Sequence, residues 1–180
     1  MTEKQEKQEK QEKQEEQEKY IGAGILFTDG NLILAGYQPQ KRKPFVSGIG
    51  GRKKKGETYL DTAVRETLEE LFELENFPYN LLTDIKSSIH PKKIVNRESY
   101  INLHCSFTDL IRILLLMNIH TIQSPLYDIM PTNLLELLFL RKQFVNKNIE
   151  ISHLCLLPVV KHDVNTPFVD QVFVEDLKTV

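Results

Sequence analysis

The sequence predicts an α/β domain in which a β-sheet is covered by helices. Two observations predict this fold class: short apolar runs bounded by turn residues recur along the chain, and amphipathic stretches of helical period lie between them. A hydrophobic content of 41% is enough to bury a core. The 180 residues therefore have room for one domain of ordinary size and a tail.

The domain is expected to begin near Tyr20 with two strands. The apolar runs 20–27 and 31–37 flank Thr28-Asp29-Gly30, and an Asp-Gly turn between apolar runs is typical of a β-hairpin. A third short strand is expected at 45–49. The later elements follow in the order helix, strand, helix, helix, strand. They are expected at 60–73, 100–107, 109–117, 133–144 and 149–160.

Residues 1–19 are expected to form a polar tail that precedes the domain at 20–180. Residues 3–19 repeat Glu-Lys-Gln and hold seven Glu and five Lys. A segment with nothing to bury cannot offset its ordering entropy, so a disordered, solubilising tail is expected. Glu and Lys four residues apart leave a solvated helix as the alternative. A coiled coil is excluded, because the repeat has no apolar a and d positions.

Composition excludes several classes of protein. The longest apolar run, 113–117, is far shorter than the roughly 20 residues that span a bilayer. The polar N-terminus resembles no signal peptide, and two cysteines cannot form a disulfide framework, so a cytoplasmic protein is expected. Neither His104-Cys105 nor His153-x-Cys155 has zinc-finger spacing, and both pairs are expected in the core.

The formal net charge of −2 conceals a sorting of charges along the chain. Residues 3–19 account for the whole excess, and the rest of the chain carries 18 acidic and 18 basic residues. Within that remainder, residues 41–55 hold seven Lys or Arg and no acid, whereas residues 57–84 hold eight acids and one base, Arg65. A basic block directly before an acidic one indicates a site that handles both an anion and a cation.

The helix expected at 60–73 gathers carboxylates on one side. At 100° per residue its apolar residues form one stripe, and Glu66, Glu69, Glu70 and Glu73 fall opposite that stripe. Carboxylates three and four residues apart repel each other by a few tenths of a kcal/mol per pair, and no lysine is interspersed. Oxygen ligands at such close quarters suit a hard divalent cation, above all Mg²⁺.

The loop before this helix supplies glycine and positive charge. Gly50-Gly51 allows a sharp turn and a close approach to a ligand. The candidate substrate-binding cations around it are Lys41, Arg42, Lys43, Arg52, Lys53, Lys54 and Lys55. A metal held by glutamates beside a row of cations suits a polyphosphate, because the metal bridges phosphate oxygens and the bases hold the remaining charge. For residues 41–43 a solvated loop is the alternative.

These residues also resemble a known motif. Gly51, Glu57 and Arg65-Glu66-Thr67-Leu68-Glu69-Glu70 stand at the spacing of the Nudix box, G-x5-E-x7-R-E-U-x-E-E-x-G-U, in which U is apolar. The first glycine and every charged position match within residues 51–73. The chain is therefore similar to Nudix hydrolases. The resemblance implies their fold, an α/β/α sandwich with a mixed sheet between helices.

Three positions depart from the box. Thr67 stands at an apolar position, and Ile49 stands where many members carry proline before the two glycines. Phe72 stands where the second glycine belongs, with Glu73 at the last apolar position. Phe72 cannot adopt a left-handed cap without cost, so the helix is expected to run one turn longer, to about Asn76. None of these changes removes a ligand.

The resemblance implies metal ligands and catalytic residues at the matched positions. The implied metal ligands are Gly50 (through its carbonyl), Glu57, Glu66, Glu69 and Glu70. The implied catalytic residues are Glu66, Glu69, Glu70 and Arg65. Glu66 would be a ligand or the general base, and Arg65 would orient the glutamates. The implied cofactor is Mg²⁺ or Mn²⁺, and the implied reaction is attack of water on a phosphorus atom of a pyrophosphate linkage.

The resemblance implies a nucleoside diphosphate linked to another moiety as substrate, and the sequence leaves its identity open. The cations favour a highly charged molecule, with a slight preference for the cap of messenger RNA. Small nucleotides and inositol pyrophosphates are alternatives, although the inositol branch usually has three glycines followed by acids. A Nudix-fold domain that binds RNA or a nucleotide without cleaving it is a further alternative.

Two more sets of residues are candidates for the site. A carboxylate outside the box often serves as base or ligand in this family, and the candidates are Glu98, Asp109, Asp128 and Glu136. Four aromatic side chains are candidates for stacking on a base, although most of them are expected in the core. They are Tyr37, Phe45, Tyr100 and Phe107.

Overall fold

The structure, a computed structural model, describes residues 20–39, 44–142, 150–159 and 168–180. The tail at 1–19 and the cations Lys41, Arg42 and Lys43 lie outside the described residues. In chain order the elements are β1 (Gly22–Phe27), β2 (Leu32–Gln38), β3 (Phe45–Ser47), β4 (Ile49–Arg52), α2 (Tyr59–Phe72), α3 (Tyr79–Ser88), β5 (Lys93–Arg97), β6 (Tyr100–Cys105), α4 (Phe107–Ile119), α5 (Leu134–Phe139), β7 (His153–Pro158) and α6 (Gln171–Leu177).

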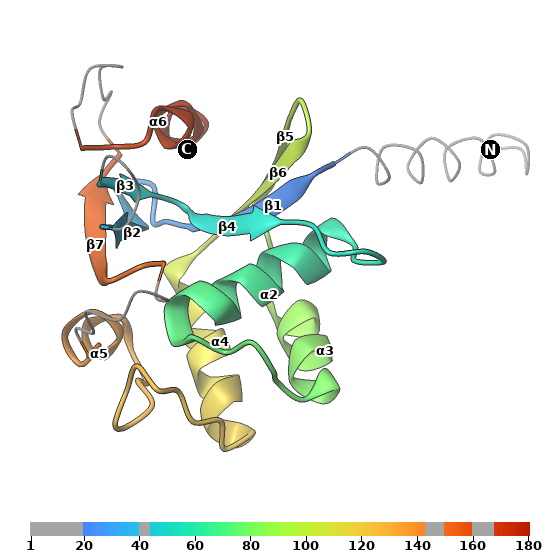
Figure 1. The fold of residues 1–180 in the computed structure, drawn as a ribbon, viewed down its shortest axis with the longest axis vertical. Coiled ribbons are helices and arrows are strands. Elements are labelled where there is room, and N and C mark those ends of the chain that lie inside the picture. Colours follow the sequence, from blue (N-terminus) through green and yellow to red (C-terminus); the bar gives the residue numbers. More distant parts are fainter. Residues whose placement is uncertain (1–19, 40–43, 143–149, 160–167) are drawn as a thin grey trace, which may run out of the picture.

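The strands form two sheets (Figure 1). A four-stranded sheet has the order β4-β1-β6-β5, in which β1 runs parallel to β6 and antiparallel to β4. A three-stranded antiparallel sheet has the order β3-β2-β7. Helices α2, α3 and α4 lie on one side of the mixed sheet and α6 lies on the other (Figure 1). The expected α/β class with a mixed sheet between helices is confirmed; the second sheet was not expected.

The expected hairpin of the first two strands is wrong. The Asp29 turn does form, because the Asp29 Oδ1 atom accepts hydrogen bonds from the amides of Asn31 and Leu32 at 2.8 and 2.7 Å. Beyond the bridge between Thr28 and Ile33, however, β1 and β2 enter different sheets. Strand β1 is buried along its whole length and has β4 on one edge and β6 on the other, so it has no edge left for β2.

The expected strand at 45–49 divides at Gly48 into β3 and β4. Strand β3 pairs with β2 and β4 pairs with β1, so this segment carries the chain from one sheet to the other. An added Cβ on Gly48 would lie 3.1 Å from the Phe173 ring of α6, which explains the small residue. The crossing places Gly50 opposite Gly24 and Gly51 opposite Ala23.

Helix α2 begins at a capping box. The Thr58 hydroxyl accepts a hydrogen bond from the Asp61 amide at 3.2 Å, and the Asp61 carboxylate accepts one from the Thr58 amide at 2.9 Å. The apolar stripe of the helix, which includes Val64, Leu68 and Leu71, is completely buried in the core under the mixed sheet. This burial fixes which side of α2 faces away from the core, and that side carries the glutamates.

Helix α2 ends at Phe72, not near Asn76 as expected. Glu73 takes the left-handed conformation (φ 54°, ψ 44°), and its amide donates a hydrogen bond to the Glu69 carbonyl at 2.8 Å. The extension fails because Phe72 is completely buried and its ring packs against Tyr127, with 5.9 Å between the ring centroids. The left-handed conformation, which costs a residue with a Cβ about 1 kcal/mol, therefore falls on Glu73.

Several other boundaries differ from expectation. Helices α3 and α6 were not expected, since segments of 10 and 7 residues are shorter than the window in which a helical period shows clearly. Strand β5 was not expected either. Helix α4 is longer than expected, and α5, β6 and β7 are shorter. His104 and Cys105 are buried as expected, but His153, at the start of β7, is exposed. No helix within the described ranges is long and apolar enough to cross a bilayer.

A buried arginine holds the end of α2. Arg141 donates hydrogen bonds to the carbonyls of Leu71, of Glu70 at 3.0 Å and of Ile151 at 2.8 Å, and only 7% of its surface is exposed. We expect Arg141→Met to lower the free energy of unfolding by about 3 kcal/mol, because it leaves buried carbonyls without donors. Urea unfolding measures this. The neighbouring Lys142→Met, which breaks an exposed ion pair, should cost less than about 1 kcal/mol, and equal costs would contradict the account.

Candidate functional site

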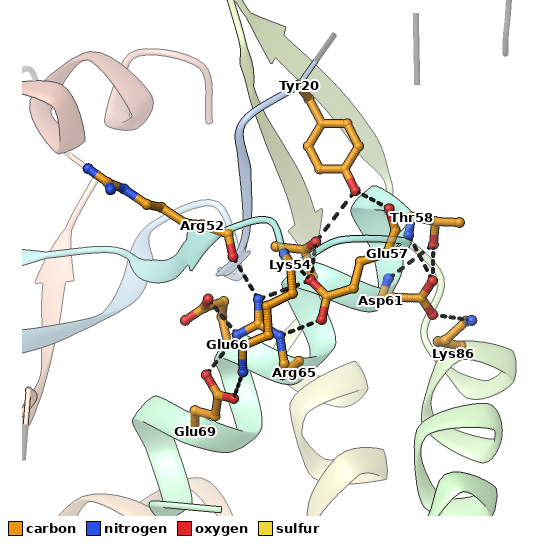
Figure 2. Close-up of polar contacts among 11 residues, drawn as sticks. Tyr20, Arg52, Lys54, Glu57, Thr58, Asp61, Arg65, Glu66, Glu69 and Lys86 are labelled. Carbon is orange, nitrogen blue, oxygen red and sulfur yellow. Dashed lines mark hydrogen bonds and ion pairs between the residues drawn. The ribbon is translucent and has the colours of Figure 1, made fainter. Parts of the chain in front are cut away.

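Arg65 lies at the centre of a cluster of carboxylates (Figure 2). Its Nε atom donates to Glu57 Oε1 at 2.6 Å, and its Nη1 atom donates to Glu66 Oε1 at 2.6 Å and to Glu69 Oε2 at 2.7 Å. Its Nη2 atom donates to the Arg52 carbonyl at 2.7 Å. Burial alone would lower the pKa of the guanidinium, but Glu57 and Glu66 raise it, so Arg65 stays charged. Arg65 thus holds three glutamates in fixed positions.

Glu57 is bound on several sides. Its carboxylate also accepts hydrogen bonds from the Lys54 amide at 2.8 Å and the Thr62 hydroxyl at 2.9 Å. Burial raises the pKa of this carboxyl, but the bonds from Arg65 and its other donors outweigh burial, and the net pKa is lowered. The Tyr20 hydroxyl donates to the Glu57 carbonyl at 2.7 Å (Figure 2). Glu57 therefore ties the loop after β4 to Arg65.

Glu66 and Glu70 reach the two glycines of β4. The Gly50 amide donates to Glu70 Oε2 at 2.7 Å. An added Cβ on Gly51 would lie 2.5–2.6 Å from the two Glu66 oxygens, so any other residue would force that carboxylate out of its position. Burial raises the pKa of both carboxyls, most strongly for Glu70, where Glu150 and Glu66 raise it further. Both glutamates would hold a proton more tightly than ordinary carboxyls unless a cation offsets their burial.

A pocket of about 460 Å³ opens beside these glutamates, and we call it the glutamate pocket. Its lining is acidic apart from three residues. The lining residues are Glu66, Glu69, Glu70, Glu73, Glu75, Glu150, Lys54, Asn76 and Leu126. Six carboxylates around one cavity create a negative potential that attracts cations.

The donor chemistry of the glutamate pocket fits a hard divalent cation. Carboxylate oxygens are the ligands that Mg²⁺ and Mn²⁺ prefer. Within the part of the chain that the structure describes, no three His, Cys, Asp or Glu side chains converge closely enough to hold a metal as they stand. Arg65 engages Glu66 and Glu69, and the Lys54 ammonium lies 2.8 Å from Glu69 Oε1. A metal would therefore displace Lys54 from Glu69.

The structure separates the four described cations of the basic block. Lys54 lines the glutamate pocket, and the Lys53 ammonium lies 4.3 Å above the centre of the Tyr20 ring. The Arg52 side chain points away from the cluster, although its carbonyl faces Arg65 (Figure 2). Lys55 is exposed. The role of these four cations in substrate binding stays a prediction. The same holds for Lys41, Arg42 and Lys43, which lie outside the described residues. That the Gly50 carbonyl is a metal ligand also stays a prediction.

The carboxylate that joins the cluster from a distant part of the chain is Glu150. It lines the glutamate pocket and acts on the pKa of Glu70, whereas none of the four candidates from sequence lines that pocket. Asp109 belongs to the capping box of α4, and Glu136 accepts hydrogen bonds from Thr132 at the start of α5. Asp128 pairs with Lys142, and Glu98 is exposed in the β5–β6 turn. Sequence reasoning missed Glu150 because no motif surrounds it. Only the fold brings it to α2.

No family model and no curated protein matches the sequence. Among solved structures, the chain is similar to a Nudix-family hydrolase from Clostridium perfringens, with 12% identity, a TM-score of 0.41, and coverage of 89% of this chain and 95% of that one. A Nudix hydrolase from Nitrosomonas europaea gives 15% identity and a TM-score of 0.31 over 48% of this chain and 56% of that one.

A bifunctional NMN adenylyltransferase/ADP ribose pyrophosphatase from Francisella tularensis, complexed with AMP and Mn ion, gives 17% identity and a TM-score of 0.31 over 48% of this chain. The match spans 26% of the length of that enzyme. Identities and TM-scores this low assign neither a family nor an activity to this chain. The case for a function therefore rests on the residues of the site.

Proposed function

We propose that this chain is a hydrolase that uses Mg²⁺ or Mn²⁺ to cleave a pyrophosphate linkage, as its resemblance to the Nudix box implies. The observation that carries the proposal is the glutamate pocket. The matched Glu66, Glu69 and Glu70, together with Glu150, line one cavity, and Arg65 holds two of them by hydrogen bonds. On an ordinary solvated helix face, two carboxylates would not both bind one buried guanidinium.

The chain's own residues supply the remaining parts of the mechanism. Glu66, Glu69, Glu70 and Glu150 would hold the metal, which when bound polarises a phosphoryl group and acidifies water. Arg65 and Glu57 position the ligands. Lys54, once released from Glu69, is placed to hold a phosphate oxygen. Glu66 serves as ligand or as the base that takes a proton from the attacking water, and its raised pKa suits a base.

For the substrate we propose a nucleoside diphosphate linked to another moiety, and the cap of messenger RNA is our preferred case. Lys54 at the pocket and the basic block beside it support a polyanionic substrate. Small nucleotides and inositol pyrophosphates are the competing substrates. We also propose that the protein is cytoplasmic.

A substrate panel tests the proposal. It should set cap-labelled RNA, an inositol pyrophosphate, ADP-ribose, a diadenosine polyphosphate and nucleoside triphosphates against Mg²⁺, Mn²⁺ and EDTA. We expect release of a phosphorylated product that stops in EDTA. Binding of RNA or nucleotide without turnover under either metal would contradict the hydrolase and support a binding module in its place.

Glu150 should contribute to metal binding. We expect Glu150→Gln to weaken the affinity for Mn²⁺ about tenfold or more, because it removes a charged oxygen ligand from the glutamate pocket. Calorimetric titration of Mn²⁺ measures this without relying on activity. Glu98→Gln is the matched control, since Glu98 is exposed in a turn and lines no part of that pocket. If both variants bind Mn²⁺ like the wild type, Glu150 is not a ligand.

A further inference from the structure

Arg141 joins the segment that carries Glu150 to helix α2. It lies just after α5, and its side chain is buried at the end of α2. Its Nη2 atom donates to two carbonyls at once, that of Glu70 at 3.0 Å and that of Ile151 at 2.8 Å. Glu70 lines the glutamate pocket, and so does Glu150, the residue before Ile151. One nitrogen atom therefore links the two stretches of main chain that bring these carboxylates to the pocket.

Two buried side chains from outside α2 bind its last carbonyls, which lack partners within the helix. The Ser124 hydroxyl donates to the Phe72 carbonyl at 2.6 Å, and Arg141 donates to the carbonyls of residues 70 and 71. Both side chains therefore cap the helix. Of the two, Arg141 is the one that also donates to Ile151, so it has a contact that capping alone does not explain.

The contact with Ile151 fixes the main chain beside an exposed carboxylate. Glu150 is exposed, whereas Ile151 is completely buried. The Ser152 amide donates to the Tyr37 carbonyl at 2.9 Å, which holds this segment to β2 in the three-stranded sheet. Arg141 holds the same segment to α2, which packs under the other sheet. The guanidinium therefore sets how close Glu150 comes to the glutamates of α2.

Glu70 is held at both ends. Its carbonyl accepts from Arg141, and its Oε2 atom accepts from the Gly50 amide at 2.7 Å. Burial has the largest effect on the pKa of Glu70 and raises it, and the positive charge of Arg141 opposes that rise. Arg141 thus lies behind the glutamate pocket, on the side of α2 where the helix ends.

We propose that Arg141 is a positioning residue for metal binding, which holds Glu150 at the glutamate pocket by joining Ile151 to the main chain of Glu70. This role rests on the proposed function, because Glu150 is a metal ligand only under that function. Arg141 touches neither metal nor substrate. Residues that orient metal ligands from behind typically change metal affinity by roughly 10- to 100-fold when they are replaced.

A double-mutant cycle on Mn²⁺ affinity tests this role. Calorimetric titration compares the wild type, Arg141→Lys, Glu150→Gln and the double variant. We expect Arg141→Lys to weaken Mn²⁺ binding about tenfold, because lysine keeps the charge but replaces the planar fork with a single nitrogen. The double variant should bind Mn²⁺ within about twofold of Glu150→Gln alone, since no ligand is then left for Arg141 to position. Losses that multiply in the double variant, or wild-type affinity in Arg141→Lys, overturn the role.

Ser124→Ala is the matched control for helix capping. It removes the bond to the Phe72 carbonyl at the same end of α2, so it should lower stability in urea unfolding, as Arg141→Lys should. Its Mn²⁺ affinity should stay within about twofold of the wild type, because the Ser124 hydroxyl does not bind Ile151. If Ser124→Ala weakens Mn²⁺ binding as much as Arg141→Lys does, capping alone sets the affinity and the role is overturned.

Tyr127→Phe takes the place of Arg141→Lys if that variant does not fold. Burial raises the pKa of the Tyr127 hydroxyl and the neighbouring Arg141 lowers it, so the two groups lie close together. Removing the hydroxyl should loosen the guanidinium and weaken Mn²⁺ binding about threefold, and this loss should disappear in the Glu150→Gln background. Wild-type affinity in Tyr127→Phe, or a loss that persists in that background, overturns the role.

The outcomes separate this role from the proposed function. Saturable Mn²⁺ binding that is weakened by Glu150→Gln but not by Arg141→Lys keeps the metal pocket and overturns the role of Arg141. Wild-type affinity in Glu150→Gln also overturns the role, and leaves the metal to the glutamates of α2. If the wild type binds no Mn²⁺, the proposed function and the role of Arg141 are overturned together.

Discussion

Glu70→Gln is expected to lower metal-dependent turnover about a hundredfold or more. Glu70 lines the glutamate pocket and its Oε2 atom is held by the Gly50 amide at 2.7 Å, so an amide at this position keeps the shape and this hydrogen bond but loses the charge. Losing one metal ligand removes several kcal/mol of transition-state stabilisation, and each 1.36 kcal/mol is tenfold in rate. Steady-state kinetics on the best substrate of the panel measures the effect, and Glu69→Gln should behave alike.

The same substitution separates catalysis from folding. The pKa of the Glu70 carboxyl is raised in the folded chain, so the folded state favours the protonated form. In the wild type, the stability that this carboxyl contributes is therefore lost as the pH rises through the raised pKa. In EDTA at neutral pH and above, Glu70→Gln should therefore be at least as stable as the wild type. Glu75→Gln, an exposed change at the rim of the same pocket, should alter turnover by less than about threefold. Wild-type turnover in Glu70→Gln would defeat the account.

Arg65→Met is expected to lower the free energy of unfolding by about 3–5 kcal/mol. Arg65 is 6% exposed and donates to Glu57, Glu66 and Glu69, so its loss leaves three partly buried carboxylates without their shared partner. Turnover should fall as well, because the ligands lose their fixed positions. Chemical unfolding and kinetics on the same preparations measure both effects.

Two variants calibrate the Arg65 result. Arg65→Lys keeps the charge but not the fork that reaches three carboxylates, so it should recover only part of the lost stability. Lys86→Met breaks the ion pair between Lys86 and Asp61. These two side chains are more exposed than that of Arg65, so the change should cost about 1 kcal/mol or less. If Arg65→Met costs no more than Lys86→Met, Arg65 does not hold the cluster together.

The local parts of the fold and the site were accessible from sequence. The apolar stripe at Val64, Leu68 and Leu71 located α2, and the spacing of the four glutamates placed all of them on the side that borders the glutamate pocket. These features depend on residues within a few turns of one helix. The period of 3.6 residues relates such positions without knowledge of the rest of the chain.

The long-range parts were not accessible. The neighbours of β1 are decided by β6, nearly eighty residues later in the chain, and not by the Asp29 turn that suggested a hairpin. Glu150 reaches α2 only because β7 returns beside β2. The end of α2 was misjudged because the burial of Phe72 against Tyr127 decides it.

Metal binding tests the central claim, that the glutamate pocket holds the divalent cation used for hydrolysis. Calorimetric titration of Mn²⁺ into the wild type and Glu70→Gln at one pH decides it directly. We predict saturable binding to the wild type and an affinity at least about tenfold weaker in Glu70→Gln. Affinity in the wild type should also fall as the pH is lowered through the raised pKa of Glu70, because protons then compete with the metal. Equal Mn²⁺ affinity in both proteins, or none in the wild type, would contradict the claim.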